Sequence, residues 1–288
     1  MSEMNKSEKS CDGTCDSCDK RGTCDDPRAR EATDRMARIK YKILVGSGKG
    51  GVGKSTVSVN LAAALKRRGY KVGLLDADIT GPDIPKLLGI EDVQLTSGPE
   101  GIEPANASGL KVISMALLLE SRDAAVVWRG PMKMAALKQF LSDVNWGDLD
   151  FLIVDLPPGT SDEPISMAQL IPDLDGAIIV TTPQEVALLD SRKAVSMFLN
   201  MGVPVLGIVE NMSGLICPHC KEVIDVFSRG GGERAAKELG VDFLGAIPLD
   251  VEIRKLGDKG LAFEGSETAS GKAFDSIVSA IVEKVSQN

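Results

Sequence analysis

Histidine is almost absent from this sequence, and cationic side chains are fewer than anionic ones. The single histidine is His219, so any mechanism that needs a histidine base must use that residue or none. The 33 lysines and arginines are outnumbered by 41 aspartates and glutamates, which gives a formal net charge of −8. A protein with this charge lacks the general attraction to phosphate backbones on which nucleic-acid binding depends. We therefore expect no nucleic-acid partner.

Long apolar runs are also missing. No run reaches the ~18 residues that a membrane-spanning helix needs, and the first residues lack the apolar stretch of a secretion signal. These absences predict a cytoplasmic protein without a membrane partner. Six cysteines in such a protein indicate metal or redox chemistry rather than structural disulfides. The length of 288 residues and the hydrophobic content of 43% suit one globular domain or two.

A glycine-rich loop is the most informative stretch of the chain. It consists of Gly48, Lys49, Gly50, Gly51, Val52, Gly53, Lys54, Ser55 and Thr56. An apolar run precedes it at 43–45 and a stretch with helical periodicity follows at 57–65, which is the strand–loop–helix context of a phosphate-binding P-loop. The glycines allow several backbone N–H groups to point at one anion. We expect Lys54 to reach the β- and γ-phosphates of ATP, and Ser55 to bind Mg²⁺.

Two carboxylates follow apolar strands and complete the predicted phosphate site. Asp78 comes after the run at 71–75, and Asp155 ends the run at 150–155. Carboxyl ends of parallel strands lie beside the P-loop in open α/β sheets. We expect Asp155 to hold Mg²⁺ through water and Asp78 to orient the attacking water, with the loop at 156–162 sensing the γ-phosphate. Phosphoryl transfer depends mainly on positioning and charge stabilisation, so the scarcity of histidine does not oppose it.

Strand-like and helix-like segments alternate along most of the chain. Strands are expected at 43–45, 71–75, 111–114, 150–155, 176–180, 203–209 and 242–246, and helices at 57–65, 131–144, 184–199, 233–239 and 271–285. This order predicts an α/β P-loop NTPase with a mostly parallel sheet covered by helices on both faces. The last helix has one apolar stripe and few basic residues, which favours packing on the core over binding to a membrane surface.

The first 38 residues form a polar arm with four cysteines, and residues 39–288 form the predicted ATPase domain. Such an arm has too few apolar side chains to order itself. Cys11, Cys15, Cys18 and Cys24 lie within fourteen residues and can fill one coordination shell, so metal binding would supply the folding energy. A 4Fe–4S cluster and Zn²⁺ both accept four cysteines. A radical-SAM site is disfavoured because that motif belongs inside a barrel.

A second cysteine motif lies near the C-terminus of the chain, at Cys217-Pro218-His219-Cys220. Two cysteines cannot fill a four-coordinate metal. Either His219 and a further ligand complete a Zn²⁺ site, or two chains contribute two cysteines each across a dyad. A redox dithiol is a third interpretation, although no thioredoxin-like strand and helix follow the motif.

The loop with its second lysine, Lys49, resembles the deviant Walker A loop of the MinD, ParA and nitrogenase-iron-protein class. Trp128-Arg129-Gly130-Pro131-Met132, the stretch 155–160 and the motif 217–220 together resemble the Mrp/ApbC branch of that class. The similarity extends from residue 41 to near the C-terminus. The arm is similar to the N-terminal cluster site of the cytosolic nucleotide-binding scaffold subfamily, with a shorter gap between the first two cysteines.

This resemblance implies a homodimeric carrier that receives an iron–sulfur cluster from assembly scaffolds and passes it to apoproteins, with slow ATP hydrolysis. Lys49 would reach the nucleotide of the partner subunit, and Asn211 would contact the purine. Cys217 and Cys220 of two chains would bridge one 4Fe–4S cluster, and the arm would hold a second. The alternatives are a MinD/ParA-like ATPase switch and a nitrogenase-iron-protein-like electron donor.

Overall fold

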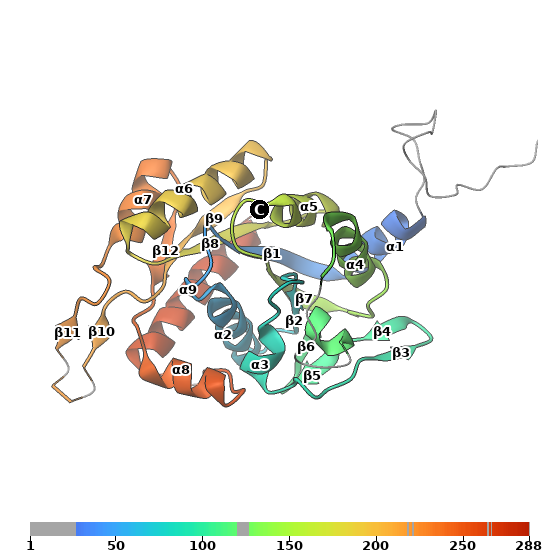
Figure 1. The fold of residues 1–288 in the computed structure, drawn as a ribbon, viewed down its shortest axis with the longest axis horizontal. Helices are drawn as coiled ribbons and strands as arrows, with labels where there is room; N and C mark the ends of the chain where they lie inside the picture. The colour runs from blue at the N-terminus through green and yellow to red at the C-terminus, as the bar shows by residue number, and fades with distance from the viewer. Residues whose placement is uncertain are drawn as a thin grey trace, which may run out of the picture.

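A central eight-stranded sheet runs through the molecule, with the strand order β12-β9-β8-β1-β7-β2-β6-β5 (Figure 1). The computed structural model describes residues 27–119, 127–217, 219–220, 222–263, 265 and 267–287, without the side chains of 27–30. The strands are β1 (Ile39–Ser47), β2 (Val72–Asp76), β5 (Ala105–Ala107), β6 (Leu110–Ser114), β7 (Leu149–Asp155), β8 (Gly176–Thr181), β9 (Val205–Glu210) and β12 (Phe243–Ala246). All neighbours are parallel except β5 and β6. The predicted α/β class is confirmed.

Consecutive side chains of the central strands enter two separate apolar clusters, one on each face of the sheet. In β1, Ile43 and Val45 belong to one cluster, whereas Leu44 belongs to the other. This alternation follows from the pleat of a strand. Because both faces are covered by helices, the strands need apolar residues at successive positions, which explains the continuous apolar runs in the sequence.

One face is covered by α2 (Lys54–Arg67) and α9 (Ala269–Gln287), with α3 (Ile84–Leu88) and α8 (Val251–Asp258) on the same side (Figure 1). Helix α2 buries Val57, Leu61 and Leu65 at intervals of four residues, as an amphipathic helix requires. Helix α9 buries a longer stripe, which consists of Phe274, Ile277, Val278, Ile281 and Val285. The prediction that the last helix packs on the core is therefore confirmed.

The other face is covered by α4 (Gly130–Ser142), α5 (Asp162–Leu170), α6 (Glu185–Asn200) and α7 (Gly231–Leu239), and α1 (Pro27–Met36) packs against α4 (Figure 1). We did not predict α1. Met36 is fully buried, and Arg35 donates hydrogen bonds to the carbonyl oxygens of Val144 and Glu100 at 3.0 and 2.7 Å. The expectation that residues 1–38 need a metal to order is thus wrong for 27–36, because these residues pack on the domain.

Several short elements have no periodic signal in the sequence. Strands β3 (Thr96–Gly98) and β4 (Gly101–Glu103) form an antiparallel hairpin between α3 and β5. Strands β10 (Leu215–Ile216) and β11 (Val223–Ile224) form another, which projects away from the sheet (Figure 1). The 3-10 helix η2 (Met115–Leu118) follows β6. None of the described helices combines the length and apolar character needed to cross a bilayer.

The strand order creates a crevice at the carboxyl end of β1. The chain leaves β1 through α2 toward β2 on one side, and it passes from β7 through α5 to β8 on the other side. Open α/β sheets bind ligands where the direction of winding changes in this way. The sheet therefore places the P-loop, which follows β1, next to the ends of β7 and β8.

Candidate functional site

The P-loop lysine and the acid at the end of β7 are in direct contact. Lys54 Nζ lies 2.7 Å from Asp155 Oδ2, and the exposed fractions of the two side chains are 6% and 1%. Ser55 Oγ donates a hydrogen bond to the same oxygen at 2.7 Å, and Ser58 Oγ donates to Oδ1 at 2.6 Å. An ammonium, a hydroxyl and a carboxylate thus meet at one point. Their chemistry fits the γ-phosphate for Lys54 and the oxygen ligands of Mg²⁺ for Ser55 and Asp155.

Two glycines of the loop have no room for a side chain. A Cβ atom on Gly48 would lie 2.1 Å from the carbonyl carbon of Asp190, in the backbone of α6. Gly53 has φ of 80°, a left-handed conformation that disfavours other residues, and its Cβ would lie 2.4 Å from Asn211 Nδ2. The loop is therefore held between α6 and the end of β9, so its backbone is fixed before any ligand binds.

Asp76 is a site residue that we did not single out in the sequence. It ends β2 directly beside Asp155 in the sheet register, and it is buried. Burial raises its pKa well above the usual 3.8, and repulsion by Asp155 adds to the rise, while a hydrogen bond of 2.9 Å from Ser114 Oγ opposes it. The sequence showed only that Asp76 is the last residue of an apolar strand. Its burial and its pairing with Asp155 in the sheet are what bring it to the site.

Asp78, the acid that we predicted at this edge, lies two residues further along. It is half-buried, and its Oδ1 accepts a hydrogen bond from the backbone N–H of Gly81 at 3.0 Å. Lys133 of α4 donates from its Nζ to Thr80 Oγ1 and to Glu163 Oε1, both at 3.0 Å. The loop after Asp78 is therefore tied to the start of α5, which follows the loop at 156–162.

Asn211 contacts the P-loop itself. Its Nδ2 donates to the carbonyl oxygen of Val52 at 2.9 Å, and the side chain is buried. A cavity of about 410 Å³ opens beside it. The cavity is lined by Gly53, Thr56, Lys86, Leu87, Asn211, Met212, Pro248, Leu249, Asp250, Ile253, Arg254, Gly257 and Asp258. It thus extends from the P-loop to α8.

Glu210, which precedes Asn211, is a buried carboxylate with three donors. It accepts from Ser213 Oγ at 2.5 Å and from the backbone N–H groups of Gly230 and Gly232 at 3.0 and 2.6 Å. These amides lie at the start of α7, where an anion is favoured by the helix dipole. Nothing in the sequence pointed to this role of Glu210 beyond the glycine run at 230–232. Glu210 thereby joins the end of β9 to both ends of the segment 213–230.

That segment contains the hairpin β10–β11 and the second cysteine motif. Cys217 is half-buried and Cys220 is exposed, and neither forms a disulfide within the described part of the chain. Backbone pairing continues from Cys217 N to Glu222 O at 2.9 Å, and Cys220 Sγ lies 3.8 Å from Glu222 Oε2. His219 is also exposed. Among the described residues, no three His, Cys, Asp or Glu side chains come together in a way that could hold a metal.

The remaining predicted residues are placed as follows. Lys49 is half-buried beside exposed Gly50 and Gly51, and its ammonium has no hydrogen-bond or ion-pair partner among the described residues. The four cysteines of the arm, Cys11, Cys15, Cys18 and Cys24, lie outside the described residues. Trp146 is buried and donates from Nε1 to the carbonyl oxygen of Phe140 at 3.2 Å, so it packs in the core rather than stacking on a ligand.

Sequence comparisons relate the chain to proteins of iron–sulfur metabolism. The family model described as ParA, NUBPL iron-transfer P-loop NTPase, matches residues 38–285. The iron–sulfur cluster carrier protein of Methanocaldococcus jannaschii is 53% identical over 282 residues, which cover 96% of this chain and 97% of the relative. The cytosolic Fe–S cluster assembly factor NUBP2 homolog of Nematostella vectensis is 49% identical over 260 residues, which cover 88% and 96%.

Solved structures give the same picture of the fold. The nucleotide-binding protein of Archaeoglobus fulgidus in complex with ADP has a TM-score of 0.75 at 38% identity, and the match covers 85% of this chain and 96% of that one. The cell division ATPase MinD of Pyrococcus furiosus has a TM-score of 0.61 at 26% identity, with coverage of 84% and 98%.

Proposed function

This chain belongs to the ParA family of NUBPL iron-transfer P-loop NTPases, and from this membership we propose that it carries iron–sulfur clusters and delivers them to apoproteins with the help of ATP. This family membership agrees with the sequence analysis, in which the P-loop resembles the deviant Walker A class and the second cysteine motif resembles its Mrp/ApbC branch. The observation that carries the proposal is that one chain joins a preformed phosphate site to the cysteine pair of the hairpin, of which Cys220 is exposed, through Glu210 and Asn211. We place this activity in the cytoplasm.

The nucleotide half of the proposal rests on Lys54, Ser55 and Asp155. Lys54 exchanges its ion pair with Asp155 for the γ-phosphate, which frees the carboxylate to act together with Ser55 as a metal ligand. Mg²⁺, when bound there, supplies positive charge that neutralises the phosphate oxygens during hydrolysis. Asp78 and the loop at 156–162 respond to the γ-phosphate, and Lys133 couples their movements because it contacts both neighbouring segments.

The base half of the nucleotide site is the cavity beside Asn211. One N–H of the Asn211 amide is used by the carbonyl oxygen of Val52, and Oδ1, the acceptor of the amide, can take a hydrogen bond from the amino group of adenine. The volume of about 410 Å³ lies within the usual range for a ligand pocket. Lys49, without a partner in the described part of its own chain, is free to reach the nucleotide of a second subunit.

The cluster half of the proposal needs a second copy of the chain. Cys217 and Cys220 provide two thiolates, and a 4Fe–4S cluster takes four. Two copies related by a dyad supply the full set. Apolar side chains next to the motif are exposed in one chain, and they would be buried against the second copy: Ile216, Val223, Ile224 and Val226. The cluster is the cargo of this dimer, and a second cluster on the arm cysteines stays a prediction.

Nucleotide and cluster are coupled through two adjacent residues at the carboxyl end of β9. Asn211 contacts the P-loop carbonyl of Val52, while Glu210 fixes both ends of the segment that contains the hairpin. A shift of the P-loop on ATP binding is therefore transmitted to the hairpin by adjacent residues. Such a shift changes the stability of a bridging cluster only if ATP binds the two arrangements with different affinity.

Anaerobic cluster transfer tests this function. The chain is reconstituted with iron and sulfide, purified, and mixed with apo-aconitase, whose recovered activity reports delivery. We expect transfer by the wild type, its loss in Cys217→Ser/Cys220→Ser, and slower transfer in Lys54→Ala despite normal cluster content. Glu233→Gln, an exposed change on α7, is the matched control. Full transfer by the cysteine variant would show that the hairpin does not carry the cluster.

A further inference from the structure

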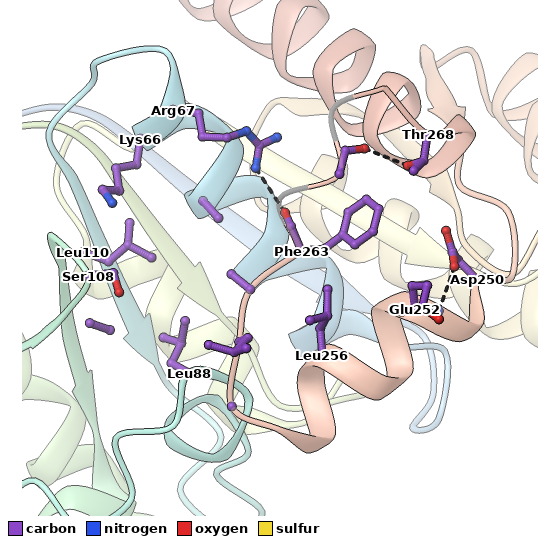
Figure 2. A pocket seen from close by; sticks show the side chains of 16 residues that line it. Lys66, Arg67, Leu88, Ser108, Leu110, Asp250, Glu252, Leu256, Phe263 and Thr268 are labelled. Atoms are coloured by element: carbon purple, nitrogen blue, oxygen red, sulfur yellow. Dashed lines mark hydrogen bonds between the residues drawn. The ribbon is translucent and has the colours of Figure 1, made fainter.

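A second cavity lies at the end of α2 opposite the P-loop (Figure 2). Its volume is about 540 Å³, and its lining comes from α2, the loop after β5, α8 and residues 260–263, 265 and 268. Lys66 lies twelve residues after Lys54 on the same helix, about 18 Å along its axis at 1.5 Å per residue. The cavity is thus separate from the phosphate site, and none of the roles given so far uses it.

The two ends of this cavity differ in charge and in what that charge contacts. Figure 2 shows Lys66 and Arg67 at one end, and Asp250 and Glu252 at the other. The acidic end is already satisfied, because Asp250 accepts from Ser270 Oγ at 2.6 Å and Glu252 pairs with Lys255 at 2.7 Å.

The basic end has one cation with no counter-charge. Arg67 donates to the carbonyl oxygen of Phe263 at 3.1 Å and pairs with Asp275 at 3.3 Å. The Lys66 ammonium has no hydrogen-bond or ion-pair partner among the described residues, although its side chain is half-buried beside the loop that contains Ser108. An anionic group entering the cavity would therefore meet an unpaired cation.

Between the two ends the lining is apolar. Leu88, Leu110, Leu256, Leu261 and Phe263 face the cavity, and Figure 2 shows Leu256 and Phe263 between the charged ends. The volume falls in the range of pockets that enclose small organic ligands. A ligand with an apolar chain and one anionic end matches this arrangement of apolar and charged side chains. The apolar chain displaces water from the leucines, and the anionic group pairs with Lys66.

We propose that this cavity binds a small amphipathic monoanion, with a medium-chain carboxylate as the model ligand, and that its occupancy changes nucleotide affinity. The second part follows from the position of α8. Glu252 and Leu256 line this cavity, whereas Ile253 and Arg254, on the same short helix, line the cavity beside Asn211. Helix α8 has no fully buried residue, so a ligand on one side adds a large part of its packing.

The backbone just after α8 transmits a change in the packing of α8 to the end of α3. Gly260 and Gly89 are in backbone contact, because a Cβ on Gly260 would lie 2.4 Å from Gly89 Cα. Gly89 caps α3, the helix that follows the loop after Asp78. A ligand that fixes α8 therefore restrains both the base cavity and this loop. Only this coupling rests on the proposed nucleotide site; binding in the cavity does not.

Calorimetric titration with octanoate tests the binding, with 1-octanol as the uncharged arm. We expect octanoate to bind the wild type, octanol to bind more weakly, and Lys66→Gln to weaken octanoate binding about tenfold. Leu256→Trp, which fills the cavity, should abolish it. Lys138→Gln, on the exposed surface of α4, is the matched control and should bind normally. Melting curves verify that each variant is folded. Octanoate binding unchanged in both Lys66→Gln and Leu256→Trp would overturn the proposal.

The coupling has its own readout. The dissociation constant of ADP is measured for each variant with and without saturating octanoate, and we expect a change of at least about threefold in the wild type that is absent in Leu256→Trp. An unchanged value in the wild type would overturn the coupling while leaving the cavity as a binding site. Absence of ADP binding without octanoate would instead point to failure of the nucleotide site.

Discussion

At the scale of single residues, the proposed nucleotide site depends on contacts that hold the P-loop in place without ATP. Lys54, Ser55 and Ser58 all contact Asp155. Lys54 and Ser55 were recognised from the pattern of the glycine-rich loop, and Asp155 from its position at the end of an apolar strand. Asp76 was not recognised, although it lies just two residues before the acid that we chose. Its burial depends on the pairing of β2 with β7, which are 73 residues apart in the chain (76 against 149), and no local pattern encodes that pairing.

The first prediction concerns the glycines of the loop. Gly48→Ala should lower the free energy of unfolding by about 2–3 kcal/mol, because the new methyl group overlaps the backbone of α6. The measurement is urea unfolding without nucleotide. Gly50→Ala is the control, since the nearest atom to its Cβ is Pro158 Cγ at 3.9 Å, and it should unfold like the wild type. Equal stability of the two variants would contradict the close packing of Gly48 on α6.

The second prediction concerns pH. The pKa of Asp76 is raised by burial, so the native state holds this proton to a higher pH than the unfolded state does. Between 3.8 and the raised pKa the native state binds more protons, and the free energy of unfolding falls as the pH rises. Asparagine does not titrate, so Asp76→Asn removes the part of this fall in the free energy of unfolding that Asp76 causes. We expect the variant to be more stable than the wild type at neutral pH.

The difference between Asp76→Asn and the wild type should shrink as the pH falls toward 4, where the wild-type carboxyl regains its proton. Urea unfolding of both proteins in matched buffers across this range gives the comparison. A stability difference that does not vary with pH would mean that Asp76 is not the titrating group. The same variant should hydrolyse ATP more slowly if Asp76 contributes negative charge to the metal site.

At the scale of elements, the central parallel strands and most of the long helices were predicted, whereas α1, α5, α8 and the strands of the two short hairpins were not. The strand at 150–155 and the helix at 271–285 have runs long enough to show a period. Strands β10 and β11 have two residues each, so no period exists to detect, and their pairing is set by the segment that Glu210 anchors. Helix α1 was missed because half of its residues are charged, and it is stabilised by packing on α4.

The third prediction tests the anchoring of the hairpin. Glu210→Ala leaves the amides of Gly230 and Gly232 without an acceptor, and should cost about 2–3 kcal/mol of stability. Hydrogen exchange measured by mass spectrometry should accelerate over residues 213–230 more than over α9. Glu233→Ala, on the exposed side of α7, should leave this exchange unchanged. Equal exchange in the two variants would show that Glu210 does not hold the hairpin.

At the scale of the whole molecule, the function that we propose requires two chains. One chain supplies two cysteines of the second motif, exposes apolar residues beside them, and leaves Lys49 without a partner in its described part. The sequence already indicated that one chain cannot complete the cluster site, because its second motif supplies two thiolates and a 4Fe–4S cluster takes four. It could not give the arrangement of the dimer, which depends on surfaces that no periodic pattern specifies.

The fourth prediction is complementation between two inactive variants. Lys49→Ala should retain its own P-loop but fail to complete the partner's site, and Lys54→Ala should do the reverse, so each alone should lose at least about 100-fold in ATP hydrolysis. Mixed in equal amounts, they form dimers with one intact site, and about a quarter of wild-type activity should return. No recovery on mixing, with mixed dimers demonstrated by mass spectrometry, would place Lys49 in its own subunit's site.

The central claim, one cluster shared by two chains, is tested most directly by iron and sulfide analysis combined with the mass in solution under anaerobic conditions. The chain used has Cys11, Cys15, Cys18 and Cys24 replaced by serine, so that only the hairpin cysteines can bind. We expect a dimer with about four iron atoms, and an iron-free protein when Cys217→Ser is added. A monomer that holds a full cluster, or a Cys217→Ser variant that keeps its iron, would contradict this claim.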